Sequence, residues 1–169
     1  MDKTKALLKE QLVFLDETGF ENNEVNLKAW SARGVKVLAD KMARPSQRYS
    51  LVSGFNKSRL VGSMVFIGYM TREIFEEYLE KVLIKYLKPR QVVVLDNARF
   101  HVGGKVKEII ESVNCKVLYL PPYCPHLNPI EKIWASVKNF VRKSFSVVEP
   151  TLTNFAKAIH EFSNQPIRE

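Results

Sequence analysis

Residues 92–120 read VVVLDNARFHVGGKVKEIIESVNCKVLYL and contain two apolar runs with a patterned segment between them. The first run, residues 92–95, has the length of a buried strand and ends at Asp96. The segment after it carries apolar residues three and four positions apart, which predicts an amphipathic helix, and residues 116–120 predict a second buried strand. A strand, a helix and a strand in this order are typical of parallel strands in a sheet covered by helices.

The chain before residue 92 adds one strand, one hairpin and one helix to this unit. Residues 12–15 form an apolar run, and the Thr18-Gly19 pair after it predicts a buried strand closed by a turn. Residues 49–55 and 60–67 are β-rich and are separated by turn-forming residues, which predicts a hairpin. Between residues 71 and 86 the apolar residues recur at helical intervals, so we expect one amphipathic helix there.

The chain after residue 120 begins with a proline-rich segment and continues with two helices. Prolines in residues 121–125 exclude a helix or a central strand there. Helices are predicted from Pro129 and from about Thr151. The chain has no internal repeat and no Gly/Ser-rich linker, so we expect residues 1–169 to form one domain. The order of elements predicts an α/β fold, a mixed sheet with helices on both faces.

The charge of the chain favours a polyanionic partner. Of 169 residues, 26 are Lys or Arg and 18 are Asp or Glu, which gives a formal net charge of +8. The segment from Lys28 to Arg59 contains eight basic residues and one acidic residue, Asp40. Nucleic acid phosphates bind such segments with salt-sensitive affinity. The alternative is a basic face that is only solvated.

No feature of the sequence indicates secretion or a membrane partner. Charged residues interrupt the first fifteen residues, which excludes a signal peptide. The longest aliphatic runs are strand-sized, far shorter than the ~18 residues of a transmembrane helix. The two cysteines, Cys115 and Cys124, form neither a CxxC pair nor a zinc ligand set, so we expect a reduced, intracellular protein.

Carboxylates are the candidate functional side chains. Asp16 and Asp96 each follow four apolar residues, so the chain twice brings a carboxylate to the end of a strand. Open α/β sheets bind ligands at this edge, and Mg²⁺ prefers carboxylate oxygens. Parallel packing would place Glu131, in the helix from Pro129, beside both aspartates. The alternatives are local: either aspartate could cap a turn, and Glu131 could accept the Asn128 backbone N–H in a capping box.

Two motifs carry a resemblance to a known family. Residues 95–101 read LDNARFH and residues 120–134 read LPPYCPHLNPIEKIW, with 34 residues between Asp96 and Glu131. They resemble the catalytic domain of DDE transposases, in the branch that joins mariner-like elements to related bacterial insertion sequences. Residues 14–20, FLDETGF, look like the first acidic motif of that family. The resemblance implies an RNase H-like (retroviral integrase-like) fold with a five-stranded mixed sheet, a core at about residues 11–143 and a C-terminal helix at about 151–163.

The resemblance also implies a catalytic centre. Asp16, Asp96 and Glu131 would be the catalytic residues and would bind two Mg²⁺ or Mn²⁺ ions. Neighbours on a strand point to opposite faces, so only one of Asp16 and Glu17 can share a site with Asp96; we favour Asp16 and keep Glu17 as the alternate. In the family, the metal ions serve phosphodiester hydrolysis at the transposon end and strand transfer of the freed 3′-hydroxyl into target DNA. A metal pair suits such an in-line displacement because it stabilises the entering and leaving oxygens.

Further residues are candidates for contacts with substrate. Asn97 and His101 match the family motif and are expected to orient substrate or a carboxylate, unless they are turn residues that are satisfied locally. Basic side chains near the site and in the basic segment are candidates for phosphate contacts, although such residues are usually only solvated. The candidate DNA contacts are Arg33, Lys36, Arg44, Arg48, Arg99, His101, Lys132 and Lys138.

The chain departs from the family before its first motif. Full-length relatives carry helix-turn-helix modules there, and only about fifteen residues precede the motif here. We therefore expect the helix-turn-helix domain to be absent from this chain, or to be a separate or frameshift-joined part. The resemblance implies a homodimer in the DNA complex. The expected location is the cytoplasm of a prokaryote, in association with the nucleoid. The alternative function is a catalytically silent, transposase-derived DNA-binding or assembly module.

Two other phosphate-handling classes do not fit the motifs. A phosphatase of the haloacid dehalogenase kind also begins with an apolar strand that ends in an aspartate, but it needs a second aspartate where Thr18 stands. A nucleotide-binding switch protein needs a GxxxxGK[ST] loop, and the sequence contains none.

Overall fold

Five strands form one mixed sheet in the order β3-β2-β1-β4-β5. The central strand β1 (Leu12–Glu21) pairs antiparallel with β2 (Arg48–Asn56), and β2 pairs antiparallel with β3 (Arg59–Ile67). On its other side β1 pairs parallel with β4 (Val92–Leu95), which pairs parallel with β5 (Lys116–Tyr119). The expected five-stranded mixed sheet is therefore confirmed.

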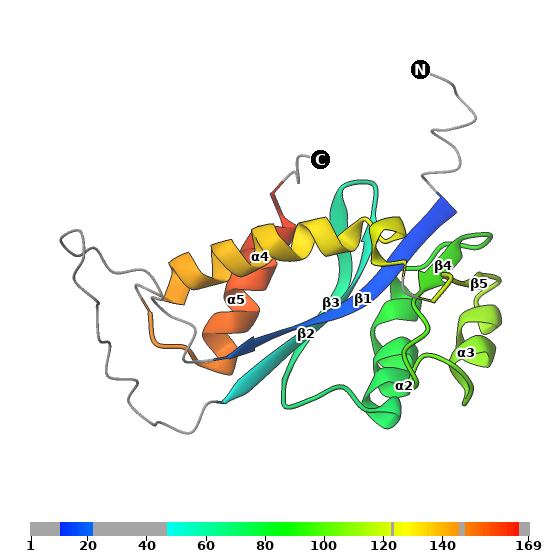
Figure 1. Ribbon diagram of the computed structural model, residues 1–169, viewed down its shortest axis with the longest axis horizontal. Coiled ribbons are helices and arrows are strands. Elements are labelled where there is room, and N and C mark those ends of the chain that lie inside the picture. The colour runs from blue at the N-terminus through cyan, green and yellow to red at the C-terminus, as the bar shows by residue number, and fades with distance from the viewer. Residues whose placement is uncertain (1–10, 22–46, 123, 146–147, 166–169) are drawn as a thin grey trace, which may run out of the picture.

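Helices cover both faces of the sheet. α4 (Ile130–Phe145) and α5 (Leu152–Ser163) pack on one face, and α2 (Arg72–Lys81) and α3 (Val106–Ser112) pack on the other. Figure 1 shows the sheet passing between these two pairs. The short 3-10 helices η1 (Leu83–Lys85) and η2 (Pro125–Leu127) follow α2 and precede α4.

The computed structural model describes residues 11–21, 47–122, 124–145 and 148–165. Within these ranges no helix combines the length and the apolar character that crossing a bilayer requires.

The alternation of side chains along β1 divides the core into two clusters. Phe14 and Phe20 pack in the cluster on the α4 and α5 face, whereas Leu15 belongs to the cluster on the α2 and α3 face. Because successive side chains of a strand point to opposite faces, Asp16 lies on the α4 face and Glu17 on the α2 face. The site described below depends on this division.

The predicted hairpin is confirmed, and its turn has two residues. Asn56 pairs with Arg59, and Lys57 and Ser58 between them have φ angles of 48° and 62°. Two central residues in the left-handed region form the turn whose twist matches that of the flanking strands.

Two predicted element ends are wrong. β1 does not stop at Thr18-Gly19 but continues to Glu21, because Gly19 pairs with Ser50 of β2. The guanidinium group of Arg48 packs over Gly19, so a Cβ at this position would require the Arg48 side chain to shift. Gly19 therefore permits a close approach within a strand and does not mark a turn.

The single helix predicted over residues 71–86 is divided. α2 ends at Lys81, and Val82 has φ −118° and ψ −66°, after which η1 continues the chain. Leu83 in η1 is fully buried, so the 3-10 turn preserves the apolar period that suggested a longer helix.

Candidate active site

The pairing of β1 with β4 brings the two aspartates side by side. Leu12 pairs with Val92 and Phe14 with Val94, in parallel. When this register is extended by two residues, Asp16 lies level with Asp96, which directly follows β4. The repeated pattern of an apolar run followed by an aspartate therefore corresponds to two equivalent positions on adjacent strands.

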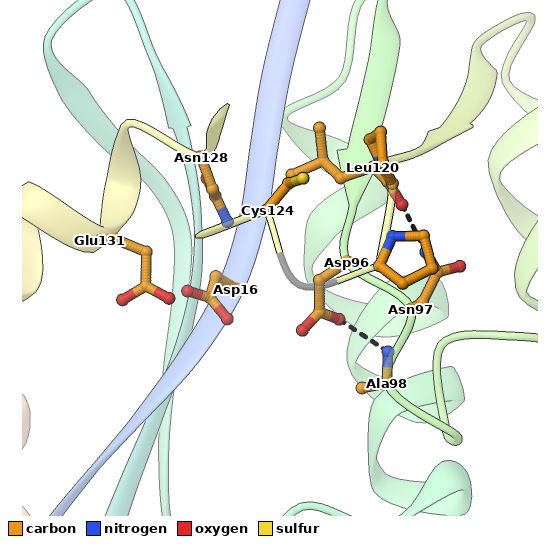
Figure 2. Close-up of a pocket in the computed structure, with 10 residues that line it drawn as sticks. Asp16, Asp96, Asn97, Ala98, Leu120, Cys124, Asn128 and Glu131 are labelled. Carbon is orange, nitrogen blue, oxygen red and sulfur yellow. Dashed lines mark hydrogen bonds between the residues drawn. The ribbon is translucent and has the colours of Figure 1, made fainter. Parts of the chain in front are cut away.

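The first turn of α4 adds a third carboxylate to the same cavity. Asp16, Asp96 and Glu131 all line a cavity of about 560 Å³, together with Asn97, Pro121 and Pro122. Figure 2 shows the three carboxylates facing this space from β1, from the end of β4 and from α4. The Asn97 side-chain amide donates to the Leu120 carbonyl, which joins the segments that follow β4 and β5. The packing expected of the Pro129 helix is therefore found in the structure.

Asp16 is a buried carboxylate, only 8% exposed. Its Oδ1 accepts the Glu17 backbone N–H at 2.8 Å, and its Oδ2 accepts the Trp134 Nε1–H at 3.0 Å. Burial raises the pKa of Asp16 to about 7, and the charges of Glu17 and Glu131 act in the same direction, against the Trp134 hydrogen bond. Trp134 lies one helical turn after Glu131, so its hydrogen bond also ties α4 to β1.

Asp96 has the opposite electrostatic environment. Its Oδ1 accepts the Ala98 backbone N–H at 2.9 Å and lies 2.5 Å from His101 Nδ1. The hydrogen bond from His101 lowers the pKa of Asp96 below its ordinary value. Burial of the His101 ring lowers its own pKa, but the hydrogen bonds and charges of Asp96 and Glu17 outweigh burial and raise that pKa to about 9. The two carboxylates therefore favour the protonated form of this buried imidazole.

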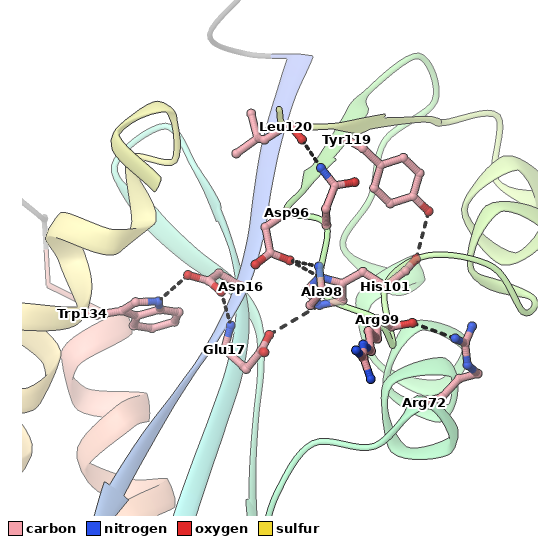
Figure 3. A network of polar contacts seen from close by, with 11 residues as sticks. Asp16, Glu17, Arg72, Asp96, Ala98, Arg99, His101, Tyr119, Leu120 and Trp134 are labelled. Carbon is pink, nitrogen blue, oxygen red and sulfur yellow. Dashed lines mark hydrogen bonds and ion pairs between the residues drawn. The ribbon is translucent and has the colours of Figure 1, made fainter. Parts of the chain in front are cut away.

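Glu17 points away from the cavity and toward His101. Its Oε2 lies 3.4 Å from His101 Nε2, so the imidazole stands between Glu17 and Asp96 (Figure 3). Sequence reasoning separated Asp16 from Glu17 by the strand period, but it did not identify Glu17 as a partner of His101. The path of residues 97–101 after β4 decides that contact, and no local pattern indicates the path.

The expectation that His101 contacts DNA is wrong in this structure, because its ring is fully buried. Arg48 is partly buried, with its guanidinium carbon 4.5 Å above the ring centre of Tyr69. Arg99 and Lys132 are exposed and Lys138 is half-buried, so these three remain candidates for phosphate contacts. Arg33, Lys36 and Arg44 lie outside the described residues.

The segment before α4 bears on the alternative interpretation of Glu131. The backbone N–H of Glu131 donates to the Asn128 carbonyl at 3.2 Å. The Asn128 side chain is only 4% exposed, and its Oδ1 has no hydrogen-bond partner among the described residues. Asn128 therefore does not cap α4 with its side-chain oxygen, although a capping box would use that atom.

The carboxylates that line the cavity supply the kind of donor that a hard divalent cation prefers. All three carboxylates supply oxygen donors, and the contacts described for Asp96 involve Oδ1 alone, which leaves Oδ2 for a ligand. In the part of the chain that the structure describes, no three His, Cys, Asp or Glu side chains lie close enough together to enclose a metal ion. Of the other two carboxylates of the cavity, Glu131 adds to the raised pKa of Asp16.

Comparison with known proteins identifies the family. The family model described as DDE superfamily endonuclease matches residues 11–150. This chain belongs to the DDE superfamily endonucleases. The uncharacterized protein y4pE/y4sA of Sinorhizobium fredii (strain NBRC 101917 / NGR234) is 26% identical over 108 residues, which cover 62% of this chain and 78% of the relative.

Solved structures similar to this DDE superfamily member are transposase and integrase catalytic cores. The Mos1 strand transfer complex has a TM-score of 0.58 at 18% identity, over 94% of this chain and 56% of the Mos1 chain. The catalytic core domain of BIV integrase has a TM-score of 0.57 at 10% identity, over 92% and 85% of the two chains. The RNase H-like fold is thereby confirmed, and this DDE chain spans little more than half the length of Mos1.

Proposed function

We propose that this chain is the catalytic domain of a DDE transposase, which hydrolyses a phosphodiester at a transposon end and transfers the freed 3′-hydroxyl into target DNA. One observation carries the proposal: Asp16, Asp96 and Glu131, from three separate elements, line one cavity. A helix cap or a turn cap would not require the three carboxylates to line the same cavity.

Asp16, Asp96 and Glu131 are the residues that would hold Mg²⁺ or Mn²⁺, as two ions. Bound divalent ions supply positive charge that stabilises the entering and leaving oxygens of an in-line displacement. Mos1 paired end complexes have been solved with Mg and with Mn, which supports the same ions here.

The remaining residues of the site position these carboxylates. Trp134 and the backbone N–H of Glu17 hold the two oxygens of Asp16, and Ala98 and His101 hold one oxygen of Asp96. Asn97 binds the Leu120 carbonyl and so fixes the wall of the cavity opposite α4. Lys132 is exposed next to Glu131, where its ammonium group can bind a phosphate of the DNA backbone.

DNA is the proposed partner, as both transposon end and target. Solved Mos1 complexes include a strand transfer complex and a complex with the left transposon end, which supports this assignment. A homodimer would bring two ends together, and a helix-turn-helix part, separate or joined by frameshifting, would recognise the end sequences.

Nicking of supercoiled plasmid DNA in Mn²⁺ or Mg²⁺ tests the proposal. We expect metal-dependent nicking by the wild-type chain and a loss of at least 100-fold, on the order of 3 kcal/mol of transition-state stabilisation, in Asp96→Asn and in Glu131→Gln. Glutamine at position 131 keeps the capping function of a glutamate, so this substitution separates a catalytic role from a helix cap. The control is Glu108→Gln, which changes an exposed carboxylate on α3.

Two results would overturn the catalytic proposal. Nicking that persists in Asp96→Asn and in Glu131→Gln would show that other groups carry the activity. DNA binding by the wild-type chain without nicking in either metal would favour the catalytically silent DNA-binding or assembly module.

A further inference from the structure

The His101 ring packs among aromatic side chains and contacts Asp96 of the candidate active site. It is fully buried, and its centroid lies 4.4 Å from those of Phe75 and Phe100. Its backbone N–H donates to the Ala98 carbonyl at 2.9 Å, and its own carbonyl accepts the Tyr119 hydroxyl at 2.9 Å. Both the ring and the backbone of His101 are therefore fixed by neighbouring elements, so the direction of its two ring nitrogens is fixed as well.

The two ring nitrogens face two different carboxylates. Nδ1 lies 2.5 Å from Asp96 Oδ1, and Nε2 lies 3.4 Å from Glu17 Oε2. Among the described residues, Glu17 Oε2 and His101 Nε2 are buried and have no other hydrogen-bond partner. The free-energy cost of burying each of these two polar atoms is therefore offset by its contact with the other.

The contacts of Asp96 divide its two oxygens. Oδ1 receives both the Ala98 N–H and His101 Nδ1, whereas these contacts leave Oδ2 unused (Figure 3). A carboxylate that is held through one oxygen presents the other in a fixed direction. Partners behind a ligating group set its orientation in metal sites in general.

We propose that Glu17 and His101 are positioning residues for Asp96: Glu17 holds the imidazole, and the imidazole holds Oδ1 so that Oδ2 faces the cavity. This inference rests on the proposed function. Glu17 thereby has a role on the opposite face of the sheet from Asp16. It acts through His101 and does not contact the substrate directly.

A matched pair of substitutions tests the direction of the chain of contacts. In His101→Asn the side-chain amide nitrogen lies near the place of Nδ1 and can still donate to Asp96. In His101→Gln the amide nitrogen lies near the place of Nε2 and can still donate to Glu17, but the donor to Asp96 is lost. We expect His101→Gln to weaken Mn²⁺ binding about 10- to 100-fold, in the range found for residues behind metal ligands, and His101→Asn to remain within about 3-fold of wild type.

Three further measurements separate positioning from packing. Mn²⁺ affinity is measured by electron paramagnetic resonance, and the unfolding temperature of each variant is measured without metal. The ring ¹⁵N shifts of His101 in the metal-free chain should change in Glu17→Gln. We expect this variant to bind Mn²⁺ about 2- to 3-fold more weakly, as His101→Asn does, because both lose the Glu17 contact and keep a donor to Asp96. His160→Asn and His160→Gln, at an exposed histidine of α5, serve as controls and should leave Mn²⁺ affinity unchanged.

The outcomes distinguish this inference from the proposed function. Equal losses of Mn²⁺ affinity in His101→Asn and His101→Gln that follow their unfolding temperatures would reduce His101 to a packing residue. Unchanged affinity in Glu17→Gln, with unchanged ¹⁵N shifts, would remove Glu17 from the chain of contacts. Asp96→Asn tests the proposed function by itself: if it retains wild-type Mn²⁺ affinity and nicking, the catalytic proposal fails whatever the His101 variants show.

Discussion

Asp16 and Asp96 occupy equivalent positions on adjacent strands, yet their environments shift their pKa values in opposite directions. Asp16 is buried beside two other carboxylates, which raises its pKa to about 7. Asp96 is half-exposed and bound by an imidazole, which lowers its pKa. The ionised form of Asp16 therefore destabilises the folded chain, whereas the ionised form of Asp96 stabilises it. The destabilising carboxylate is the one that Trp134 connects to α4.

The raised pKa of Asp16 predicts that Asp16→Asn stabilises the metal-free chain more at pH 8 than at pH 5. Between about pH 4 and pH 7 the folded state binds a proton that the unfolded state has released, so the wild-type chain loses stability as the pH rises through this window. One pKa unit corresponds to about 1.36 kcal/mol, so the advantage of the variant should grow by roughly 2–3 kcal/mol from pH 5 to pH 8. Urea unfolding in the presence of EDTA measures this difference, and a difference that stays constant would contradict the prediction.

Trp134→Phe removes the Nε1–H donor to Asp16 while an aromatic ring remains at the position. We expect the pKa of Asp16 to rise above about 7, because its ionised form loses a hydrogen bond. We also expect a loss of about 2 kcal/mol in the free energy of unfolding at pH 8, as for hydrogen bonds to charged groups. Carboxyl ¹³C shifts follow the pKa.

Ile133→Val, at the neighbouring core position of α4, is the control for lost core volume. It should cost about 1 kcal/mol without any change in the pKa of Asp16. If Trp134→Phe also left the Asp16 titration unchanged, the hydrogen bond would not act on that carboxylate.

The sequence identifies the aspartates but not their partners. A carboxylate after four apolar residues is visible as a local pattern, and the strand period separates Asp16 from Glu17. The contacts of Trp134 with Asp16 and of His101 with Glu17 join residues 118 and 84 positions apart. They depend on how α4 and the segment after β4 pack, and no local pattern of polarity carries that information.

At the scale of elements, α2 braces the segment that follows β4. Arg72 donates from Nη1 to the Val102 carbonyl at 2.9 Å and from Nη2 to the Arg99 carbonyl at 2.7 Å. Glu76 Oε1 accepts the Lys105 backbone N–H at 2.9 Å. The helix thus holds both ends of the segment in which His101 lies.

Arg72→Lys should loosen this segment, because one ammonium group cannot reproduce the planar fork that spans two carbonyls. We expect amide hydrogen exchange at His101 and Val102 to become about tenfold faster, as the loss of about 1.4 kcal/mol of local stability implies. Lys81→Ala, which removes an exposed ion pair with Glu77 on the same helix, should leave these rates unchanged. Equal rates in Arg72→Lys and wild type would show that α2 does not brace the segment.

Element ends are predicted less well than the elements themselves. Periodicity predicts the strands and helices around the site, but it misplaces the end of β1 because a Thr-Gly pair usually marks a turn. Pairing with β2 overrides that local preference, since Gly19 provides room for the Arg48 side chain. Periodicity also does not show that α2 ends at Lys81, because η1 continues the same apolar pattern.

At the scale of the whole molecule, the net charge of +8 predicts salt-sensitive binding of nonspecific DNA. The logarithm of affinity should fall with the logarithm of salt concentration by about 0.9 for each neutralised phosphate. Lys132→Ala should reduce this slope by about 1, because Lys132 is exposed and directly follows Glu131, which lines the cavity. Fluorescence anisotropy of a labelled duplex, recorded from about 50 to about 200 mM KCl, measures the slope.

Lys107→Ala on α3 is the control for this measurement, since α3 lies on the opposite face of the sheet from α4. Its slope should equal that of the wild-type chain. If the two lysine variants had equal slopes, the cavity side of the molecule would have no special part in phosphate binding.

The part of β1 beyond its pairing with β4 is held by helices of one face of the sheet. Pairing of β1 with β4 ends at Phe14, whereas pairing with β2 continues to Glu21. At about 3.3 Å per residue, Asp16 lies about 7 Å beyond Phe14 along the strand, and Glu21 about 23 Å beyond it. The Phe20 ring packs against Phe155 of α5, with ring centroids 4.7 Å apart, and Trp134 of α4 donates to Asp16. A bound molecule that displaced the far end of β1 would therefore disturb the same two helices, one of which carries Glu131.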